Sequence, residues 1–318
     1  MTPTTLSRIT SLTAATALTI GLAACGRSAQ TTDSAPSPTA STSAPTTTAP
    51  PTTAAPTPTS TTSQRSSAAL DELVAVGGAK MHLHCAGNGD HTVLLIAGFT
   101  SDRTAFGSVE AELSASSRVC SYDRFGTGTS DAPPTPQTFA TQAEDLHELL
   151  TSVHEGGPYV VVGHSFGGDI AVTFTSLFAG DVRGLLLLDA SPAMWNVALC
   201  GVADDGSEGA ASFVAGCAMQ SEPANNSEGL AGPATFAELA KITSLGAIPM
   251  IVDSAAQHGY EGLDPSTASQ LNEVWNAGQQ HWASLSSAAQ LVAVDQSGHQ
   301  IQFDRPDLVI AQVAELNA

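Results

Sequence analysis

The stretch Pro158-Tyr159-Val160-Val161-Val162-Gly163-His164-Ser165-Phe166-Gly167-Gly168 predicts a strand, a tight turn and the start of a helix. The β-branched residues 160–162 are typical of a buried strand, and apolar residues at helical spacing follow over 169–178. Between them, Gly163 to Gly167 has the spacing G-x-S-x-G. In this context the serine hydroxyl projects from a sharp corner, and the glycines let strand and helix approach closely. We therefore predict that Ser165 is a nucleophile; the alternative is a glycine-rich turn with an incidental serine.

Apolar runs continue on both sides of this stretch. We predict strands at 70–75, 80–85, 91–96, 118–122, 160–162, 182–188, 248–252 and 290–294, and helices at 104–114, 141–153, 169–178, 266–285 and 307–316. Several strands are apolar throughout rather than alternating, which is typical of a parallel sheet covered on both faces by helices. The fold class is therefore α/β. Residues from 192 to about 245 break this rhythm, and we interpret them as an insertion over the sheet, called the cap below.

The N-terminal residues 1–24 have the features of an export signal, with Arg8 followed by an apolar run of small residues. They end in Leu22-Ala23-Ala24-Cys25-Gly26, which resembles the lipobox of bacterial lipoproteins. That resemblance implies that Cys25 becomes the lipidated first residue and tethers the protein to a membrane surface. The alternative is an ordinary secretory signal. In either case we expect an exported protein, anchored in the cell envelope or secreted.

Thr, Ser, Pro and Ala dominate residues 25–69, so this segment cannot bury enough apolar surface to offset its ordering entropy. We predict an extended tether there. Residues 70–318 have the size of one α/β domain, which we expect to be a monomer. No stretch after the signal is long and apolar enough to span a bilayer.

The chain is acidic, with 10 Lys and Arg against 30 Asp and Glu and a formal net charge of −20. It has no cluster of Lys and Arg, which argues against a nucleic-acid partner. The sequence also lacks a Cys/His spacing typical of zinc sites. We therefore predict no metal and no organic cofactor.

Four cysteines remain when Cys25 is set aside: Cys85, Cys120, Cys200 and Cys217. Export favours disulfides, and four cysteines allow three pairings. Cys200 and Cys217 both fall in the cap, where a cross-link restricts the unfolded ensemble of a loosely packed segment. We prefer that pair; the alternative is four free thiols.

Four motifs, in order along the chain, resemble those of the α/β-hydrolase fold family. They are Ile96-Ala97-Gly98-Phe99, Tyr122-Asp123-Arg124-Phe125-Gly126-Thr127-Gly128-Thr129-Ser130, Gly163-His164-Ser165-Phe166-Gly167-Gly168 and Ser297-Gly298-His299. The resemblance covers nearly everything from Leu70 onward and implies an α/β-hydrolase fold with a mostly parallel sheet, flanking helices and a cap. In the family's strand order the strands at 80–85 and 118–122 are neighbours, which implies a Cys85–Cys120 disulfide. It also implies that Asp123 and Arg124 brace loops beside the pocket.

The family's chemistry needs a serine activated by a histidine, and a carboxylate that orients the histidine. The resemblance assigns these first two roles to Ser165 and His299. Of the other histidines, we interpret His164 as a wall of the pocket and His258 and His281 as surface or packing residues.

The acid is where this chain departs from the common pattern. The family's usual position is the loop after the strand at 248–252, but the Gly-x-x-Asp stretch is missing there. Some members carry the acid at the end of the preceding strand, where Asp189 directly follows four leucines. We choose Asp189, with Asp253 second and Asp264 third; a purely structural Asp189 at the corner before the cap is the alternative.

An oxyanion hole needs two backbone N–H donors aimed at the developing negative charge. The resemblance assigns one to Phe166, the residue after the nucleophile, and the other to Phe99. This chain has Ala97-Gly98 where the family often has His-Gly. Because the donor belongs to the backbone, the missing histidine should not remove it.

These residues together imply a serine hydrolase similar to carboxylesterases and lipases, which cleaves a small-molecule ester, a lipid ester or a thioester through an acyl-enzyme. A serine at the elbow argues against epoxide and haloalkane hydrolysis, because family members with that chemistry carry Asp there. The same triad would also serve C–C bond hydrolysis or perhydrolysis. The alternative from another class is a catalytically silent envelope protein that binds a ligand or partner, and the missing standard acid is its best support.

Overall fold

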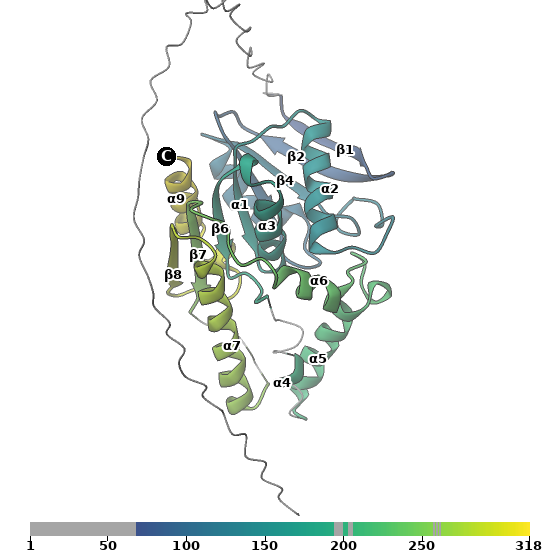
Figure 1. Cartoon of the computed structure of the whole chain (residues 1–318), viewed down its shortest axis with the longest axis vertical. Coiled ribbons are helices and arrows are strands. Elements are labelled where there is room, and N and C mark those ends of the chain that lie inside the picture. The colour runs from purple at the N-terminus through teal and green to yellow at the C-terminus, as the bar shows by residue number, and fades with distance from the viewer. Residues whose placement is uncertain (1–67, 194–199, 203–205, 257, 259, 261) are drawn as a thin grey trace, which may run out of the picture. The chain divides into compact units, whose positions relative to one another are not determined.

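An eight-stranded sheet forms the centre of the protein in the computed structural model, which describes residues 68–193, 200–202, 206–256, 258, 260 and 262–318 (Figure 1). The predicted signal at 1–24, Cys25 and the tether up to residue 67 lie outside these residues. The strands are β1 (Leu70–Val76), β2 (Ala79–Ala86), β3 (Thr92–Ile96), β4 (Arg118–Asp123), β5 (Tyr159–His164), β6 (Val182–Leu188), β7 (Met250–Ala255) and β8 (Ala289–Val294). Their order is β1-β2-β4-β3-β5-β6-β7-β8. β2 runs antiparallel to β1 and β4, and the pairings from β4 to β8 are parallel, which confirms the predicted mostly parallel sheet.

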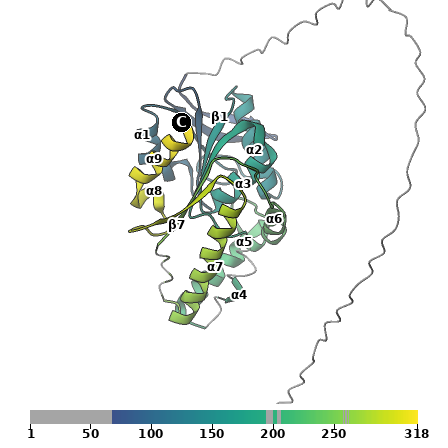
Figure 2. The same ribbon diagram turned by 60° about the vertical axis from the view of Figure 1, so that its left-hand side comes forward.

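Helices cover both faces of the sheet, as Figure 2 shows. The helices of the domain are α1 (Gly107–Leu113), α2 (Phe139–Ser152), α3 (Phe166–Leu177), α7 (Pro265–Ser284), α8 (Ile301–Asp304) and α9 (Pro306–Asn317). Side chains alternate along each strand, so Val161 packs in the layer with α2, α3 and α7. Val160 and Val162 pack with α1, α8 and α9. Each such fully buried aliphatic side chain contributes about 1.5–3 kcal/mol, and this two-faced burial explains why the strands are apolar throughout.

Local sequence explains where several elements begin and end differently from the prediction. The helix predicted at 104–114 is split into a 3₁₀ turn, η1 (Arg103–Phe106), and α1. α2 begins at Phe139, because Thr138 and Thr141 form a reciprocal capping box. α3 begins at Phe166, immediately after the elbow, rather than at residue 169. The strand predicted at 248–252 is β7, which extends to Ala255, so Asp253 lies within the strand and not in a loop.

The cap separates β6 from β7 and is largely helical where the structure describes it. It holds α4 (Cys200–Val202), α5 (Glu208–Ser221), the 3₁₀ turn η4 (Pro223–Asn225) and α6 (Gly232–Leu239). α6 packs on the domain through Phe236, whose ring lies 5.2 Å from that of Phe139 on α2. The cap is therefore anchored on the same face of the sheet as α2 and α3.

Both disulfides preferred from the sequence are present. Cys85 and Cys120 are directly opposite residues of β2 and β4, with their Cα atoms 4.1 Å apart. Cys200 and Cys217 join α4 to α5 at a Cα separation of 5.9 Å. Two disulfides indicate an oxidising, extracytoplasmic environment. None of the helices that the structure describes is both long and apolar enough to cross a membrane.

The parallel strands determine where a site can form. β3, β5, β6 and β8 all point the same way, so the loops that follow them leave from one edge of the sheet. Ligand sites in α/β sheets lie outside the carboxyl ends of the strands. Phe99, Ser165, Asp189 and His299 follow these four strands, and the topology therefore gathers them at that edge.

Candidate active site

Ser165 occupies a strained corner between β5 and α3. Its φ is 52° and its ψ is −125°, in a region that non-glycine residues rarely adopt. A Cβ atom at Gly167 would lie 2.2 Å from the carbonyl oxygen of Ile96, so only glycine allows α3 to begin so close to the end of β3. Such strain costs on the order of 1–3 kcal/mol and persists where the surroundings enforce it. The result is a half-buried serine at the first turn of a helix.

His299 lies on the loop between β8 and α8 and contacts Ser165 across the edge of the sheet. Its Nε2 atom is 3.0 Å from Ser165 Oγ. Its Nδ1 atom is 2.7 Å from Asp189 Oδ2. The carboxylate accepts from Nδ1–H, which leaves Nε2 as the acceptor for the serine hydroxyl. About a third of the His299 side chain (34%) is exposed, so the imidazole is accessible from solvent.

Asp189 directly follows β6, and its side chain is fully buried. Its φ is 45°, which turns the carboxylate toward the loop of His299. The Asp189 carboxylate accepts further hydrogen bonds from the Ala255 N–H at 3.0 Å and the Trp275 indole N–H at 2.9 Å. Burial alone would raise the pKa of Asp189, but hydrogen bonds from His258 and His299 outweigh it and leave the pKa well below its ordinary value. Asp189 is thus held as an anion beside His299.

His258 is a second imidazole on the same carboxylate, a role that the sequence-based interpretation as a surface or packing residue missed. Its Nε2 atom lies 2.9 Å from Asp189 Oδ2, and its side chain is buried. Its Nδ1 atom lies 3.1 Å from Asn272 Oδ1. The amide nitrogen of Asn272 donates to Ala268 O, which fixes the orientation of that amide. Both ring nitrogens of His258 therefore face oxygen atoms, one on Asp189 and one on Asn272.

The two alternative acids lie elsewhere. Asp253 is in β7 and points into the layer of α9, where Gln312 Nε2 donates to its carboxylate at 2.7 Å. Burial raises the pKa of Asp253 to about 7. Asp264 caps α7 by accepting from Ser266 N–H. No hydrogen bond between either carboxylate and His299 occurs among the described residues, so the structure brings only Asp189 of the three to the histidine.

His164 forms the inner wall of the site, beneath the loop of His299. Its Nε2 atom donates to the carbonyl oxygen of His299 at 2.8 Å, and the two rings lie 4.8 Å apart. Burial lowers the pKa of His164 to about 3, so the ring is neutral. This matches the wall assigned to it from the sequence and gives it a positioning contact on the His299 loop.

The two predicted oxyanion donors flank the serine. A Cβ at Gly98 would lie 3.5 Å from Ser165 Cβ, so the loop that carries Phe99 runs against the elbow. The rings of Phe99 and Phe166 lie 5.2 Å apart. Among the residues that the structure describes, the backbone N–H of neither Phe99 nor Phe166 has a hydrogen-bond partner. Two free N–H groups beside a serine hydroxyl have the composition of an oxyanion hole.

A sequence model of the Alpha/beta hydrolase family matches residues 93–312. The chain belongs to the alpha/beta hydrolase family. Family membership supports hydrolase activity in general.

Two curated relatives of this chain are themselves uncharacterized. The Bacillus subtilis protein YqjL is 27% identical over 133 residues, which are 42% of this chain and 52% of that protein. An uncharacterized Mycobacterium tuberculosis protein is 34% identical over 115 residues, 36% of this chain and 33% of that protein. The chain therefore spans about half of the first relative and a third of the second.

Solved structures of low sequence identity share the fold of this chain. An enol-lactonase from Burkholderia xenovorans has a TM-score of 0.55 at 19% identity, with 77% of this chain and 99% of that chain covered. A thermophilic esterase from Thermogutta terrifontis has a TM-score of 0.51 at 20% identity, with coverage of 78% and 97%. The epoxide hydrolase CorEH has a TM-score of 0.54 at 19% identity, with coverage of 78% and 98%.

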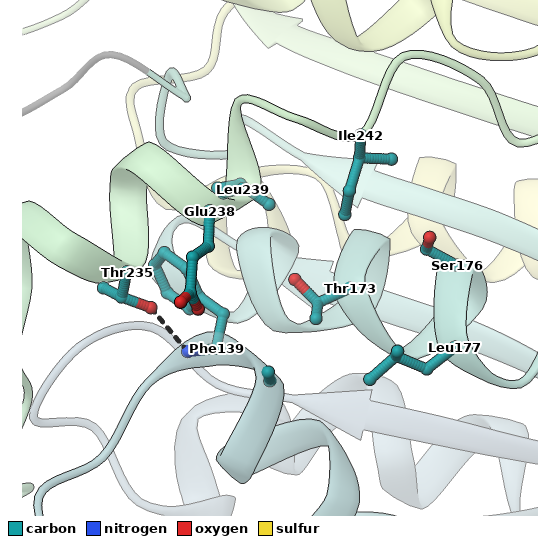
Figure 3. Close-up of a pocket in the computed structure, with 9 residues that line it drawn as sticks. Phe139, Thr173, Ser176, Leu177, Thr235, Glu238, Leu239 and Ile242 are labelled. Carbon is teal, nitrogen blue, oxygen red and sulfur yellow. Dashed lines mark hydrogen bonds between the residues drawn. The ribbon is translucent and has the colours of Figure 1, made fainter.

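Two cavities lie near α7 and α6. The larger, of about 400 Å³, lies between α7, the start of the cap and Ala240; it is lined by Pro192, Ala193, Ala240, Val274, Ala277, Gly278 and His281. Figure 3 shows the smaller one, of about 160 Å³, between α2, α3 and the segment of α6. There the Phe139 N–H donates to Thr235 Oγ1, and Ser176 and Glu238 stand at the margin. Ser165, Asp189 and His299 are not among the residues that line either cavity.

A metal ion has no evident place among the described residues. Cys85, Cys120 and Glu155 bring three ligand atoms close together, but the two sulfurs are bonded to each other. His82 and His84 on β2 lie next to a carboxylate: His82 Nε2 is 2.9 Å and His84 Nδ1 is 3.4 Å from Asp71 Oδ1.

Proposed function

We propose that this protein is a serine hydrolase that cleaves a carboxylic ester or thioester through an acyl-enzyme, with Ser165, His299 and Asp189 as its triad. One observation carries the proposal: Ser165 Oγ, His299 and Asp189 are linked in series by contacts of 3.0 Å and 2.7 Å. These are hydrogen-bonding distances between a nucleophile, a base and an orienting acid.

Each step of the reaction uses an atom already in place. Ser165 Oγ attacks the carbonyl carbon while His299 Nε2 takes its proton, and Asp189 stabilises the imidazolium that forms. The tetrahedral intermediate collapses as His299 returns the proton to the leaving alcohol or thiol. Water then enters, gives its proton to the same nitrogen and attacks the acyl-enzyme. The second tetrahedral intermediate collapses to the acid as His299 returns that proton to Ser165 Oγ, which frees the serine.

Negative charge on the tetrahedral intermediate has three sources of stabilisation. The N–H groups of Phe99 and Phe166 are the proposed donors. The N-terminus of α3, which begins at Phe166, adds the positive end of the helix dipole. Loss of one such donor typically lowers kcat by about 10²- to 10³-fold.

The silent binding protein is the alternative from another class, and its support was the missing standard acid. The contact between Asp189 and His299 supplies a carboxylate at the required place, so we favour the enzyme. The positive φ of Ser165 also fits an activated serine, because backbone strain gathers at functional sites.

The larger cavity is lined by no triad residue, but its lining is mostly apolar and includes neighbours in sequence of residues that contact the triad; this supports a substrate with an apolar acyl or alcohol group. Val274 and Gly278 flank Trp275 on α7, and Trp275 bonds Asp189 and lies 5.2 Å from the His299 ring. Pro192 follows Ser191, whose N–H donates to Ser165 O at 3.2 Å. Small side chains such as Ala193 and Ala277 keep the cavity open. Its volume lies in the range of small-molecule sites.

A fluorophosphonate probe tests the nucleophile. We expect labelling of the wild type and none of Ser165→Ala, while Ser176→Ala at the margin of the smaller cavity is labelled normally. A folded wild type that resists the probe, or equal labelling of Ser165→Ala, would sink the serine-hydrolase proposal.

A panel of p-nitrophenyl esters and thioesters of graded acyl length tests the substrate class. We expect hydrolysis to peak at an intermediate acyl length and Ala277→Phe to move the peak to shorter chains. If the labelled enzyme hydrolyses none of these, C–C bond hydrolysis and perhydrolysis, which use the same triad, become the chemistry to assay.

We further propose that the protein is exported and held at a membrane by lipid on Cys25, with the two disulfides as support for an extracytoplasmic location. The expected result is that the wild type partitions into detergent and that Cys25→Ser moves to the soluble fraction with full esterase activity. If the wild type and Cys25→Ser both stay in the soluble fraction, the protein is secreted without a lipid anchor.

A further inference from the structure

Glu228 is a carboxylate of the cap that is fully buried against the loop of the proposed oxyanion hole. It lies between η4 and α6 and has no exposed surface. Its Oε2 accepts from Arg124 Nε at 2.8 Å. Its Oε1 accepts from Arg124 Nη2 at 3.0 Å and from the Thr100 N–H at 2.6 Å. One cap side chain therefore contacts both the guanidinium behind the loop and the loop itself.

Arg124 carries the contact further along the same loop, residues 97–100. Its Nη1 donates to Ala97 O and its Nη2 to Gly98 O, each at 2.7 Å. Burial alone would lower the pKa of Arg124, but the charge of Glu228 outweighs it and raises the pKa, so the guanidinium stays charged. The guanidinium also lies 5.5 Å above the ring of Phe166.

These bonds fix both peptide planes that flank Phe99. The Gly98 carbonyl and the Phe99 N–H belong to one planar trans peptide and point in opposite directions. Holding Gly98 O on Arg124 therefore aims the Phe99 N–H away from Arg124. The next peptide is fixed by the Thr100 N–H on Glu228, and Thr100 has a φ of 59° that needs such support.

The cap segment that carries Glu228 is itself held firmly. Gly229 O accepts from the Gln137 N–H at 2.8 Å, and the Ala231 N–H donates to Gln137 O at 2.8 Å. A Cβ at Gly126 would lie 1.9 Å from Ser227 O, so the loop after β4 is pressed against the same segment. The position of the cap is thereby transmitted to the oxyanion loop.

We propose that Glu228 is a positioning residue that couples the cap to the oxyanion hole, acting through Arg124 and Thr100 on the Phe99 N–H. This inference rests on the proposed function. Glu228 touches neither Ser165 nor His299, so it acts on the stabilisation of the tetrahedral intermediate and not on proton transfer. Its loss should lower kcat and leave KM nearly unchanged, because the hole is used only in the transition state.

The fold offers a matched control at the other end of β4. Arg118 and Glu155 form a second buried Arg–Glu pair, in which Arg118 Nε donates to Glu155 Oε1 at 3.1 Å. Arg118 begins β4, whereas Arg124 follows its end, so the two pairs lie roughly 20 Å apart at about 3.3 Å per residue. Loss of either pair leaves a buried charge uncompensated, but only one pair contacts residues 97–100.

The test compares Glu228→Gln with Glu155→Gln on the p-nitrophenyl ester that the wild type hydrolyses best. We expect kcat of Glu228→Gln to fall about 10²-fold with KM within about threefold, and kcat of Glu155→Gln to stay within about twofold at a comparable loss of Tm. A trifluoromethyl ketone, which forms a tetrahedral adduct on serine, should lose affinity in parallel with kcat. Glu228→Asp should recover part of the loss.

Wild-type kcat in folded Glu228→Gln, or equal kcat losses in both variants, would overturn the coupling. If Glu228→Gln does not fold, the neutral pair Arg124→Gln/Glu228→Gln removes both charges and is measured instead, with the same outcomes. Ser165→Ala separates this inference from the proposed function. Activity that survives in Ser165→Ala defeats the hydrolase mechanism, whereas activity that needs Ser165 but ignores Glu228 defeats only the coupling.

Discussion

Asp189, directly after β6, lies beside Asp253 in the neighbouring strand β7, and both are fully buried, yet their pKa values are shifted in opposite directions. The Asp189 N–H donates to Asp253 O at 2.9 Å, so their backbones are directly bonded. The pKa of Asp189 is held well below its ordinary value, and that of Asp253 is raised to about 7. Burial is common to both and cannot explain the difference.

The difference comes from the donors that each carboxylate meets. Asp189 leaves the sheet at its carboxyl edge, where a backbone N–H, an indole and two imidazoles converge on it. Asp253 stays inside β7 and faces the apolar layer of α9, where Gln312 is its single donor and one oxygen has no partner among the described residues. A buried carboxylate is therefore an anion only where the fold brings donors to it.

The largest effect should come from exchanging charge for an amide at each position. We expect Asp189→Asn to lower kcat by about 10³- to 10⁴-fold, because the amide no longer stabilises the imidazolium of His299. Asp253→Asn should change kcat by less than about threefold. The measurement is steady-state ester hydrolysis with the active serine titrated by fluorophosphonate; the reverse ranking would make Asp253 the acid.

The next effect concerns stability rather than activity. The pKa of Asp253 rises from 3.8 in the unfolded chain to about 7 in the fold, so the folded state holds the proton more tightly. Stability from this group is present at low pH and is lost as pH rises from about 4 to about 7. As the pH rises through that window, the free energy of unfolding of Asp253→Asn should therefore increase relative to that of the wild type, by at most about 4 kcal/mol. Tm measured at pH 4, 5.5 and 8 checks this, and a parallel shift at all three would contradict it.

A smaller effect should follow from removing one donor from Asp189. His258→Gln removes the imidazole that bonds the Asp189 carboxylate, at a cost of about 1.5–3 kcal/mol for a hydrogen bond to an ionised group. The folded pKa of Asp189 then rises, and stability that depends on its charge is lost at a higher pH during acidification. The midpoint of acid unfolding should move upward. His281→Gln is the control, since burial is the cause that lowers the pKa of that ring; an identical midpoint shift there would speak against a specific role for His258.

The smallest effect belongs to Asp264, the third candidate for the acid. It caps α7 through the Ser266 N–H, so Asp264→Ala should cost about 1 kcal/mol of stability. Turnover should remain within about twofold of wild type. Chemical denaturation gives the loss of stability, and ester hydrolysis on the same preparation gives kcat. A collapse of kcat would make Asp264 the acid of the triad.

Features that depend on neighbours in sequence could be predicted from the sequence. The strand, elbow and helix around Ser165 are contiguous, so residue types and spacing are enough to place them. The apolar strands likewise predicted a mostly parallel sheet, because a strand buried on both faces has no polar alternate positions. The order of motifs then indicated His299, although it lies 134 residues from Ser165.

Features that depend on which loops meet at the sheet edge needed the tertiary structure. The sequence left three aspartates open, because a carboxylate after either of two neighbouring strands can reach the same histidine. Only the tertiary structure shows that Asp189, at a φ of 45°, contacts His299, whereas Asp253 stays in the apolar layer of α9. His258, Trp275 and Glu228 gave no local signal, since their partners lie 69, 86 and 104 residues away.

The sequence by itself determined the elbow, the sheet and the histidine, because these follow from local propensity, apolar periodicity and motif order. The tertiary structure alone decided which carboxylate has its pKa lowered and how the loop of Phe99 is held. The physical reason is that ionisation and backbone aim are set by hydrogen-bond donors and acceptors converging in space. That convergence comes from the packing of distant segments and leaves no pattern along the chain.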